Sequence, residues 1–130
     1  MTAATDRRRP LFTDFETARA AIACLRQCDR VEDTETLAFV LMPDHLHWLL
    51  ALQAASLSGV VRRFKSTSAR AICCPAAIDG QRIWQPGYHD HALRRDDDVL
   101  GAARYVIANP VRAGLTTSVR DYPHWDARWV

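Results

Sequence analysis

The sequence predicts an α+β fold in which helices cover one face of an antiparallel sheet. The spacing of apolar residues changes along the chain and gives the order helix, two strands, helix, strand, helix. The chain has 130 residues, of which 48% are hydrophobic and 25% are charged, as is usual for one globular domain. We therefore expect residues 1–130 to form a single domain.

The first half of the chain supplies two helices and a hairpin. Residues 14–28 carry apolar side chains at helical spacing behind a cap-type residue. Residues 36–42 and 45–52 are rich in strand formers, and the turn pair Pro43–Asp44 separates them. A second helix is predicted for residues 56–72, because a serine suited to capping precedes its apolar positions.

The second half supplies one strand and one helix. Residues 82–94 are typical of a strand that is interrupted by a bulge near Pro86–Gly87. Residues 96–108 begin with three acidic side chains, which favour a helix N-terminus. Pro110 disfavours helical conformation at the preceding residue, so we expect this helix to end at Asn109.

The two ends of the chain lack a periodic pattern. Residues 1–9 contain three arginines and few strand formers, so we predict a disordered basic arm there. In the C-terminal tail, Trp125 and Trp129 are the expected docking residues. No apolar stretch is long enough to span a bilayer and no secretory signal is visible, which predicts a cytoplasmic protein. The cysteines have no C-x-x-C spacing and are expected to be reduced thiols: Cys24, Cys28, Cys73 and Cys74.

Two histidines stand one residue apart in the second predicted strand. Side chains alternate across a strand, so Leu46 and Trp48 face the core while His45 and His47 share the other face. Two imidazoles on one face can chelate a cation, although two merely hydrogen-bonded histidines would give the same pattern. A second pair, His89 and His91, has the same spacing and ranks lower as a metal pair, but His91 could contact a phosphate.

The third predicted helix carries Tyr105 and Asn109 four residues apart and off its apolar stripe. Residues at this spacing share a helix face, so a phenol and a carboxamide would stand side by side. With a metal at the histidines, the Asn109 oxygen could be a third ligand and Tyr105 could point at the group that the metal polarises. Without the histidines, a capping asparagine and a packed tyrosine would explain the pattern.

The charge is distributed unevenly. The formal net charge is only +2. From Leu50 to Ile78, however, the chain has basic residues and no acidic one, which indicates a local anion-binding face on the second helix. The residues are Arg62, Arg63, Lys65 and Arg70.

Five motifs occur together in a fixed order, namely MPDHLHWLL, FKSTSAR, WQPGYHDHALR, YVIANPVRAGL and DYPHWDARW. In combination they resemble the tyrosine transposases associated with repetitive extragenic palindromes (REP). These are relatives of the IS200/IS605 single-tyrosine transposases in the His-hydrophobic-His nuclease superfamily. The resemblance runs from about Pro10 to the C-terminus and implies a ferredoxin-like fold. Relatives usually begin with a further strand, and the polar first nine residues suggest that this strand is missing here.

The resemblance also implies a site. His45 and His47 would bind a divalent ion, Mg²⁺ or Mn²⁺, with Asn109 as the third ligand, and Tyr105 would be the nucleophile. Family members cut single-stranded DNA near hairpins and keep a 5′-phosphotyrosine link. A phenol has an ordinary pKa near 10 and needs such help to react at neutral pH.

The implied partner is single-stranded or hairpin DNA, which would place the protein at the bacterial nucleoid. A homodimer is a further expectation, because some relatives build their active sites across two chains. Phosphate contacts are expected from the basic helix 56–72, Arg112 and His91, and Tyr88 is a candidate platform for stacking an unpaired base.

Three other functions fit parts of the pattern. The chain could be a non-catalytic DNA-binding remnant of the same family, which a lost first strand would favour. It could be a metal-dependent phosphodiesterase that forms no covalent intermediate. The least favoured reading is a ferredoxin-like RNA-binding protein whose histidines have no catalytic role.

Overall fold

A computed structural model describes residues 1–73, 82–94 and 97–128 of the chain. Its centre is a four-stranded antiparallel sheet in the order β1-β3-β2-β4. The strands are β1 (Thr2–Ala4), β2 (Thr34–Leu41), β3 (His45–Leu52) and β4 (Trp125–Ala127). The predicted α+β class and the predicted hairpin of β2 and β3 are confirmed.

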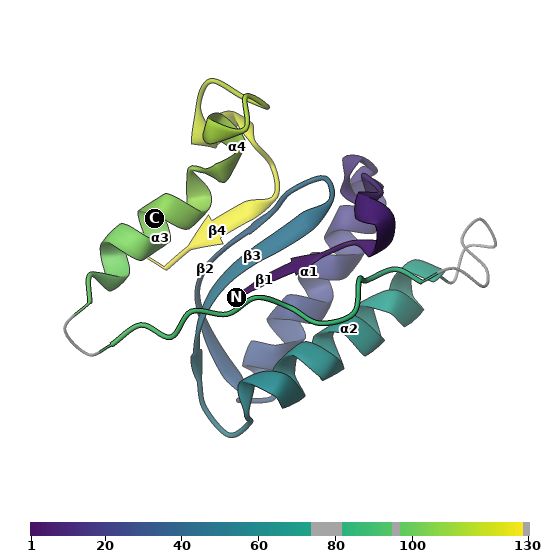
Figure 1. The fold of residues 1–130 in the computed structure, drawn as a ribbon, viewed down its shortest axis with the longest axis vertical. Coiled ribbons are helices and arrows are strands. Elements are labelled where there is room, and N and C mark those ends of the chain that lie inside the picture. The colour runs from purple at the N-terminus through teal and green to yellow at the C-terminus, as the bar shows by residue number, and fades with distance from the viewer. Residues whose placement is uncertain (74–81, 95–96, 129–130) are drawn as a thin grey trace.

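Two long helices, α1 (Phe15–Arg30) and α2 (Leu57–Cys73), cover one face of the sheet (Figure 1). The helices begin where the sequence predicts caps. Asp14 accepts a hydrogen bond from the Thr17 amide at 2.9 Å, and Ser56 accepts one from the Gly59 amide at 3.2 Å. The apolar stripes of both helices pack against the side chains on the facing side of the sheet, which are Phe39, Leu41, Leu46 and Trp48.

The third helix, α3 (Val99–Ile107), lies on the opposite face of the sheet (Figure 1). The expectation that helices cover one face therefore holds for α1 and α2 but not for α3. The reason is that β2 and β3 carry apolar side chains on both faces. Ala103 of α3 packs against Ala38 and Ala127, and partly buried Leu49 joins this second cluster. The helix ends before Pro110 as predicted, and a short turn, α4 (Asn109–Arg112), follows.

The first residues correct the sequence-based expectation of a disordered arm and a missing strand. β1 pairs with β3, and its Ala3 side chain is 1% exposed in the main core. The chain then forms two short 3₁₀ turns, η1 (Asp6–Arg8) and η2 (Leu11–Thr13). The sequence Thr-Ala-Ala has weak strand propensity, but pairing on both sides outweighs propensity in so short a strand.

On its other side, β1 pairs with part of residues 82–94, the segment that the sequence predicts as an interrupted strand. Backbone hydrogen bonds join Thr2 to His89 at 2.7 and 2.9 Å, and the Gln85 amide to the Ala4 carbonyl at 2.9 Å. Only isolated bridges form, because Pro86 and Gly87 bulge between them, with Gly87 at φ 80°. An extended segment at the sheet edge thus encloses β1 between itself and β3.

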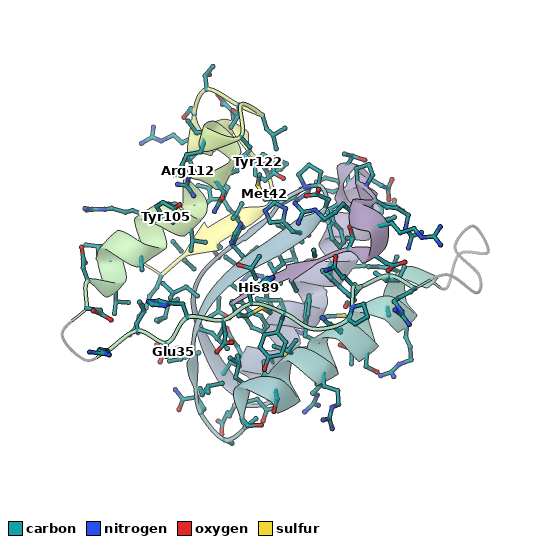
Figure 2. The ribbon with its side chains drawn as sticks, in the orientation of Figure 1. Glu35, Met42, His89, Tyr105, Arg112 and Tyr122 are labelled. Atoms are coloured by element: carbon teal, nitrogen blue, oxygen red, sulfur yellow. The ribbon has the colours of Figure 1, made fainter. Side chains whose placement is uncertain are left out.

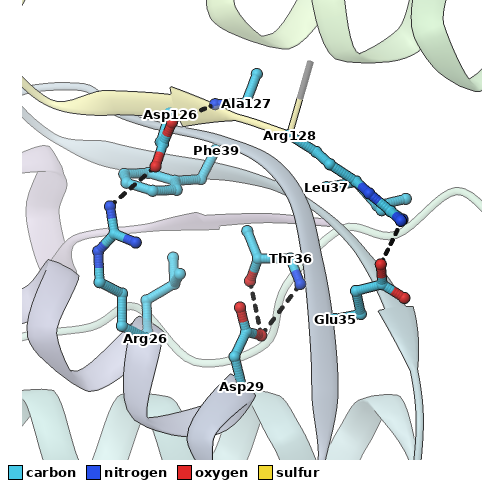
Figure 3. Close-up of a pocket in the computed structure, with 10 residues that line it drawn as sticks. Arg26, Asp29, Glu35, Thr36, Leu37, Phe39, Asp126, Ala127 and Arg128 are labelled. Carbon is cyan, nitrogen blue, oxygen red and sulfur yellow. Dashed lines mark hydrogen bonds and ion pairs between the residues drawn. The ribbon is translucent and has the colours of Figure 1, made fainter. Parts of the chain in front are cut away.

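The far edge of the sheet is β4, which the sequence did not predict as a strand. Arg26 of α1 pairs with Asp126 at 3.0 Å, and Arg128 pairs with Glu35 of β2 (Figure 3). These ion pairs fasten β4 over the pocket between α1 and β2. Trp125 packs against the α3 cluster, as its predicted docking role requires, whereas Trp129 lies outside the described residues.

Two further sequence expectations concern thiols and membranes. Cys24 and Cys28 are free thiols on α1, and Cys74 lies outside the described residues. No helix among the described residues combines the length and the apolar character that crossing a bilayer requires.

Candidate functional site

The imidazoles of His45 and His47 lie side by side on the sheet face against which α3 packs. Their Nε2 atoms are 3.0 Å apart. The other nitrogen of each ring is held by a neighbour, since His45 Nδ1 lies 2.6 Å from Asp44 Oδ1 and His47 Nδ1 lies 3.1 Å from Thr2 Oγ1. Thr2 stands directly opposite His47 in the pairing of β1 and β3. Both rings are thus oriented so that their Nε2 atoms converge on one point.

Two converging nitrogen lone pairs repel each other unless a proton or a cation lies between them. Asp44 accepts a hydrogen bond from the Nδ1–H of the neutral His45 ring, which leaves Nε2 of His45 as an acceptor. The Thr2 hydroxyl can donate to His47 or accept from it, so it supports either tautomer of that ring. When it accepts, both Nε2 atoms are unprotonated, and this is the form that a divalent ion requires. The donor set therefore fits a metal ion.

Burial and neighbouring charges favour the neutral imidazole of His47 and the charged carboxylate of Asp44. Burial, together with the positive charges of His45, the N-terminus, Arg112 and Arg8, lowers the pKa of His47 to about 4. Burial alone would raise the pKa of Asp44, but its hydrogen bond with His45 and the charge of Arg8 hold that pKa below its usual range. A neutral imidazole and a charged carboxylate behind the pair are the states that favour metal binding.

Tyr105 lies on α3, and Asn109 begins α4, so the two residues predicted for one helix belong to two consecutive helices. The Tyr105 side chain is 66% exposed, and the Arg112 guanidinium carbon stands 3.7 Å from the centre of its ring (Figure 2). The helix α3 packs against the sheet face that carries the histidine pair, so the tyrosine and the pair lie on one side of the sheet. Asn109 donates from its amide nitrogen to the Val106 carbonyl at 2.9 Å, so its carboxamide oxygen is the atom that could meet a cation.

The described residues contain no cluster of three or more histidine, cysteine or acidic side chains suited to a metal. A cation bound by the two imidazole nitrogens would therefore need oxygen atoms as its remaining ligands. The carboxamide of Asn109 and oxygen atoms of a bound substrate are the candidates, and Asn109 as a ligand stays a prediction from the sequence.

The basic residues of α2 lie away from the histidine pair, because α2 covers the opposite face of the sheet. Arg63 pairs with Asp33 at 3.1 Å. Lys65 donates to the Gln85 carbonyl at 2.9 Å and also to the Gly87 carbonyl. Arg70 donates to Ser66 at 2.8 Å, and Arg62 is exposed. Two of the four predicted DNA contacts thus already hold other parts of the protein.

The remaining predicted DNA residues fall into two places. Tyr88 lines a cleft beside β1, together with Thr2 and His89. His91 lines a separate, mainly apolar groove with residues of β3 and the start of α3. Only Tyr88 therefore shares a cleft with a residue that contacts the histidine pair.

Sequence reasoning missed three residues of this site. Asp44 could have been found, because a carboxylate next to a candidate ligand is a common orienting group. Thr2 and Arg8 could not, because the sequence places both in a segment without a pattern. Arg8 pairs with Asp44 at 3.1 Å and so stands one contact behind His45.

The family to which the chain belongs follows from comparison with known proteins. The family model described as "Transposase IS200 like" matches residues 1–108. The chain belongs to this family. The curated "REP-associated tyrosine transposase" of Escherichia coli (strain K12) is 30% identical over 115 residues, which cover 87% of this chain and 64% of that protein. A Haemophilus influenzae protein described in similar terms is 29% identical over 100 residues, which cover 69% of this chain and 57% of that protein.

Solved structures agree with the fold. The REP-associated tyrosine transposase bound to a REP hairpin matches with a TM-score of 0.77 at 25% identity, over 95% of this chain and 72% of that chain. A Deinococcus radiodurans transposase matches with a TM-score of 0.61 over 83% of this chain and 85% of that one, and its 24% identity shows the fold alone. The chain spans less than two thirds of the curated relatives that it matches. The resemblance to REP-associated transposases is confirmed.

Proposed function

We propose that this chain is a metal-dependent endonuclease and strand transferase that acts on single-stranded DNA next to REP-like hairpins. The observation that carries the proposal is the histidine pair, whose Nε2 atoms converge at 3.0 Å while Asp44 and Thr2 hold the outer nitrogens. The relative bound to a REP hairpin supports the choice of DNA.

His45 and His47 would hold a divalent ion, with the carboxamide oxygen of Asn109 as a further ligand. Imidazole ligands suit Mn²⁺ better than Mg²⁺, which prefers oxygen ligands. When bound, the ion supplies Lewis-acid polarisation and orientation of the scissile phosphate. The chain itself supplies the shape of the site, because the hydrogen bonds of Asp44 and Thr2 fix both rings before the ion arrives.

Tyr105 is the proposed nucleophile. Its phenol oxygen forms a bond to phosphorus while the bond from phosphorus to the 3′-oxygen breaks. The phenol proton leaves to solvent, and the 3′-oxygen takes up a proton to become a hydroxyl. The product is a 5′-phosphotyrosine ester that a 3′-hydroxyl can attack later, so strand transfer needs no external energy source. Tyr105 is exposed and therefore accessible to a strand, and Arg112 places a positive charge beside its ring.

We propose contacts to the DNA backbone on both faces of the sheet. Arg112 is next to the nucleophile and would meet the phosphate that approaches it. Arg62 and Arg70 of α2 are exposed on the opposite face and would hold a more distant part of the hairpin. Such contacts position the DNA without reading its sequence.

The test is the formation of a covalent protein–DNA adduct. Purified protein is incubated with Mn²⁺ and a 3′-labelled REP-like hairpin that carries single-stranded flanks, and denaturing gels resolve the adduct. We expect an adduct with the wild type, none with Tyr105→Phe, and none with His45→Ala. Arg30→Ala, a change on the far end of α1, serves as the matched control and should form the adduct.

Other outcomes would identify the alternatives. DNA binding without any adduct in the wild type would indicate a non-catalytic DNA-binding protein. Cutting that survives Tyr105→Phe but is lost in His45→Ala would indicate a phosphodiesterase without a covalent step. Either outcome rejects the proposed nucleophile.

A further inference from the structure

His89 is a histidine beside the proposed metal site that the proposed function leaves without a role. The chain has five histidines, of which His45 and His47 form the pair. His124 is buried, and His91 lines a separate groove with residues of β3 and the start of α3. The fifth is His89, which pairs with β1 next to the histidine pair.

Backbone pairing fixes the face of the sheet to which the His89 side chain belongs. Thr2 and His89 exchange both of their backbone hydrogen bonds, at 2.7 and 2.9 Å, so they stand directly opposite each other. Residues that stand opposite each other in an antiparallel pair project from the same face. The Thr2 hydroxyl lies 3.1 Å from His47 Nδ1, which shows that this is the face of the histidine pair. His89, Thr2 and His47 therefore form a row across three neighbouring segments.

The His89 imidazole is accessible to a substrate. The residue is exposed, and within the part of the chain that the structure describes no hydrogen bond or ion pair engages its ring. Two strand spacings, roughly 10 Å, separate the backbone at His89 from that at His47, which leaves room for a phosphate group between the rings. Lys65 of α2 donates to the carbonyls of Gln85 and Gly87 and so holds the segment that carries His89.

His89 and Tyr105 belong to opposite sides of the histidine pair. α3 packs over β4, β2 and β3, whereas β1 and the segment of His89 lie beyond β3 in the order of the sheet. In the shared view of Figures 1 and 2, β3 lies between Tyr105 and His89. A phosphate held at His45 and His47 would therefore meet the phenol from the side of α3 and the imidazole from the side of β1.

The chemistry of phosphoryl transfer requires a group in such a position. The attacking and leaving oxygens stand roughly in line through phosphorus, so a group that assists the leaving oxygen must lie across the phosphate from the nucleophile. A positioned side chain that gives a proton to the leaving oxygen accelerates such a step by roughly 10²–10⁴-fold. Imidazole is the side chain that most readily gives up a proton near neutral pH, whereas the guanidinium of Arg8, which lines the same cleft, keeps its protons.

We propose that His89 is the general acid of the cleavage step. The inference rests on the proposed function and names the residue that serves its leaving oxygen. As the Tyr105 oxygen bonds to phosphorus, the bond to the 3′-oxygen breaks, its electron pair stays on that oxygen, and the His89 imidazolium gives the oxygen a proton. The neutral imidazole then takes a proton from the incoming 3′-hydroxyl when strand transfer reverses the step. The phenol proton passes to solvent in the first step and returns from solvent in the second.

A substrate whose leaving atom needs no proton tests this role. Two 3′-labelled REP-like hairpins are compared in Mn²⁺, one unmodified and one with sulfur in place of the bridging 3′-oxygen at the linkage that the wild type cuts. A thiolate leaves without a proton, because thiols are much stronger acids than alcohols. We expect His89→Ala to slow adduct formation at saturating protein by about 100-fold with oxygen and to match the wild type with sulfur. Gln27→Ala, an exposed change on α1, should match the wild type with both substrates.

A binding measurement distinguishes a general acid from a DNA contact. In the Tyr105→Phe background with EDTA present, fluorescence anisotropy should give the same dissociation constant with and without His89→Ala. Recovery with sulfur also shows that the His89 variant is folded.

Several results would overturn the inference. They are a full rate of His89→Ala with oxygen, a defect that persists with sulfur, a weaker affinity for the hairpin, or a sulfur-rescued defect in Tyr88→Phe instead. Each of these leaves Tyr105 as the nucleophile and rejects the role of His89 alone. A wild type that forms no adduct with either substrate rejects the proposed function and this inference together.

Discussion

At the scale of single residues, the site depends on how the outer nitrogens of two imidazoles are held. His45 has a carboxylate behind it, whereas His47 has a hydroxyl. A carboxylate can only accept from the ring, so it fixes one tautomer, while a hydroxyl adapts to either. Asp44 is therefore the stronger orienting group of the two. It is also the residue through which Arg8 reaches the pair.

This difference gives a prediction for metal binding. Asp44→Asn keeps the shape of the side chain but removes the charge that orients His45. We expect the affinity for Mn²⁺ to fall by about 10- to 100-fold, as for other changes behind a metal ligand. Isothermal titration calorimetry in the Tyr105→Phe background measures it without any reaction. Asp126→Asn, which removes an acid far from the histidines, is the control, and an unchanged dissociation constant in Asp44→Asn would contradict the assignment.

At the scale of elements, the long helices and the hairpin could be predicted because each repeats its pattern several times. α1, α2, β2 and β3 all lie close to their expected bounds. β1 and β4 have three residues each, too few for a period to show, and both exist because neighbours pair with them. Helix periodicity shows that α3 has an apolar stripe, but it does not say which sheet face that stripe covers.

Whether a residue lies in a segment with a repeated local pattern also decides which site residues could be predicted. His45 and His47 share a face by strand alternation, so local geometry suffices for the pair, whereas Ala108 separates the helices of Tyr105 and Asn109 and their role together stays a prediction. Thr2, Arg8 and His89 join the site only through the pairing of β1 with its two neighbours, which the sequence does not display. Lys65 shows the reverse case. It looks like a DNA contact in the sequence, but in the fold it donates to the carbonyls of Gln85 and Gly87.

Lys65 therefore yields a prediction about element packing. Lys65→Ala should lower the free energy of unfolding by about 1 kcal/mol, because two carbonyl oxygens lose a charged donor at a partly exposed site. Arg62→Ala, an exposed change three residues away on the same helix, should lie within about 0.5 kcal/mol of wild type. Urea unfolding followed by circular dichroism compares them. Equal stabilities would show that Lys65 does not hold the 85–87 segment.

At the scale of the whole molecule, the sheet separates two groups of basic residues. Arg8 pairs with Asp44 beside the histidines and Arg112 stands over Tyr105, whereas the cations of α2 belong to a helix on the other face of the sheet. With a net charge of only +2, attraction to DNA depends on these local groups rather than on the overall charge. A DNA that contacts both groups must reach both faces of the sheet.

The stability of the whole molecule should depend on pH through His124. This side chain is buried between Phe15 and Tyr122, and among the described residues its Nδ1 atom has no hydrogen-bond partner. Burial lowers its pKa, and the charge of Arg19 adds to the effect.

The unfolded chain then takes up a proton near pH 6.5 that the folded chain resists, so stability is complete above that pH and falls as the pH drops below it. We expect His124→Phe to lose less stability than the wild type between pH 7 and pH 5 in urea unfolding. His47 contributes equally in both proteins and cancels in the difference. His91→Asn, at an exposed position, should behave like the wild type, and parallel losses in all three proteins would exclude His124 as the source.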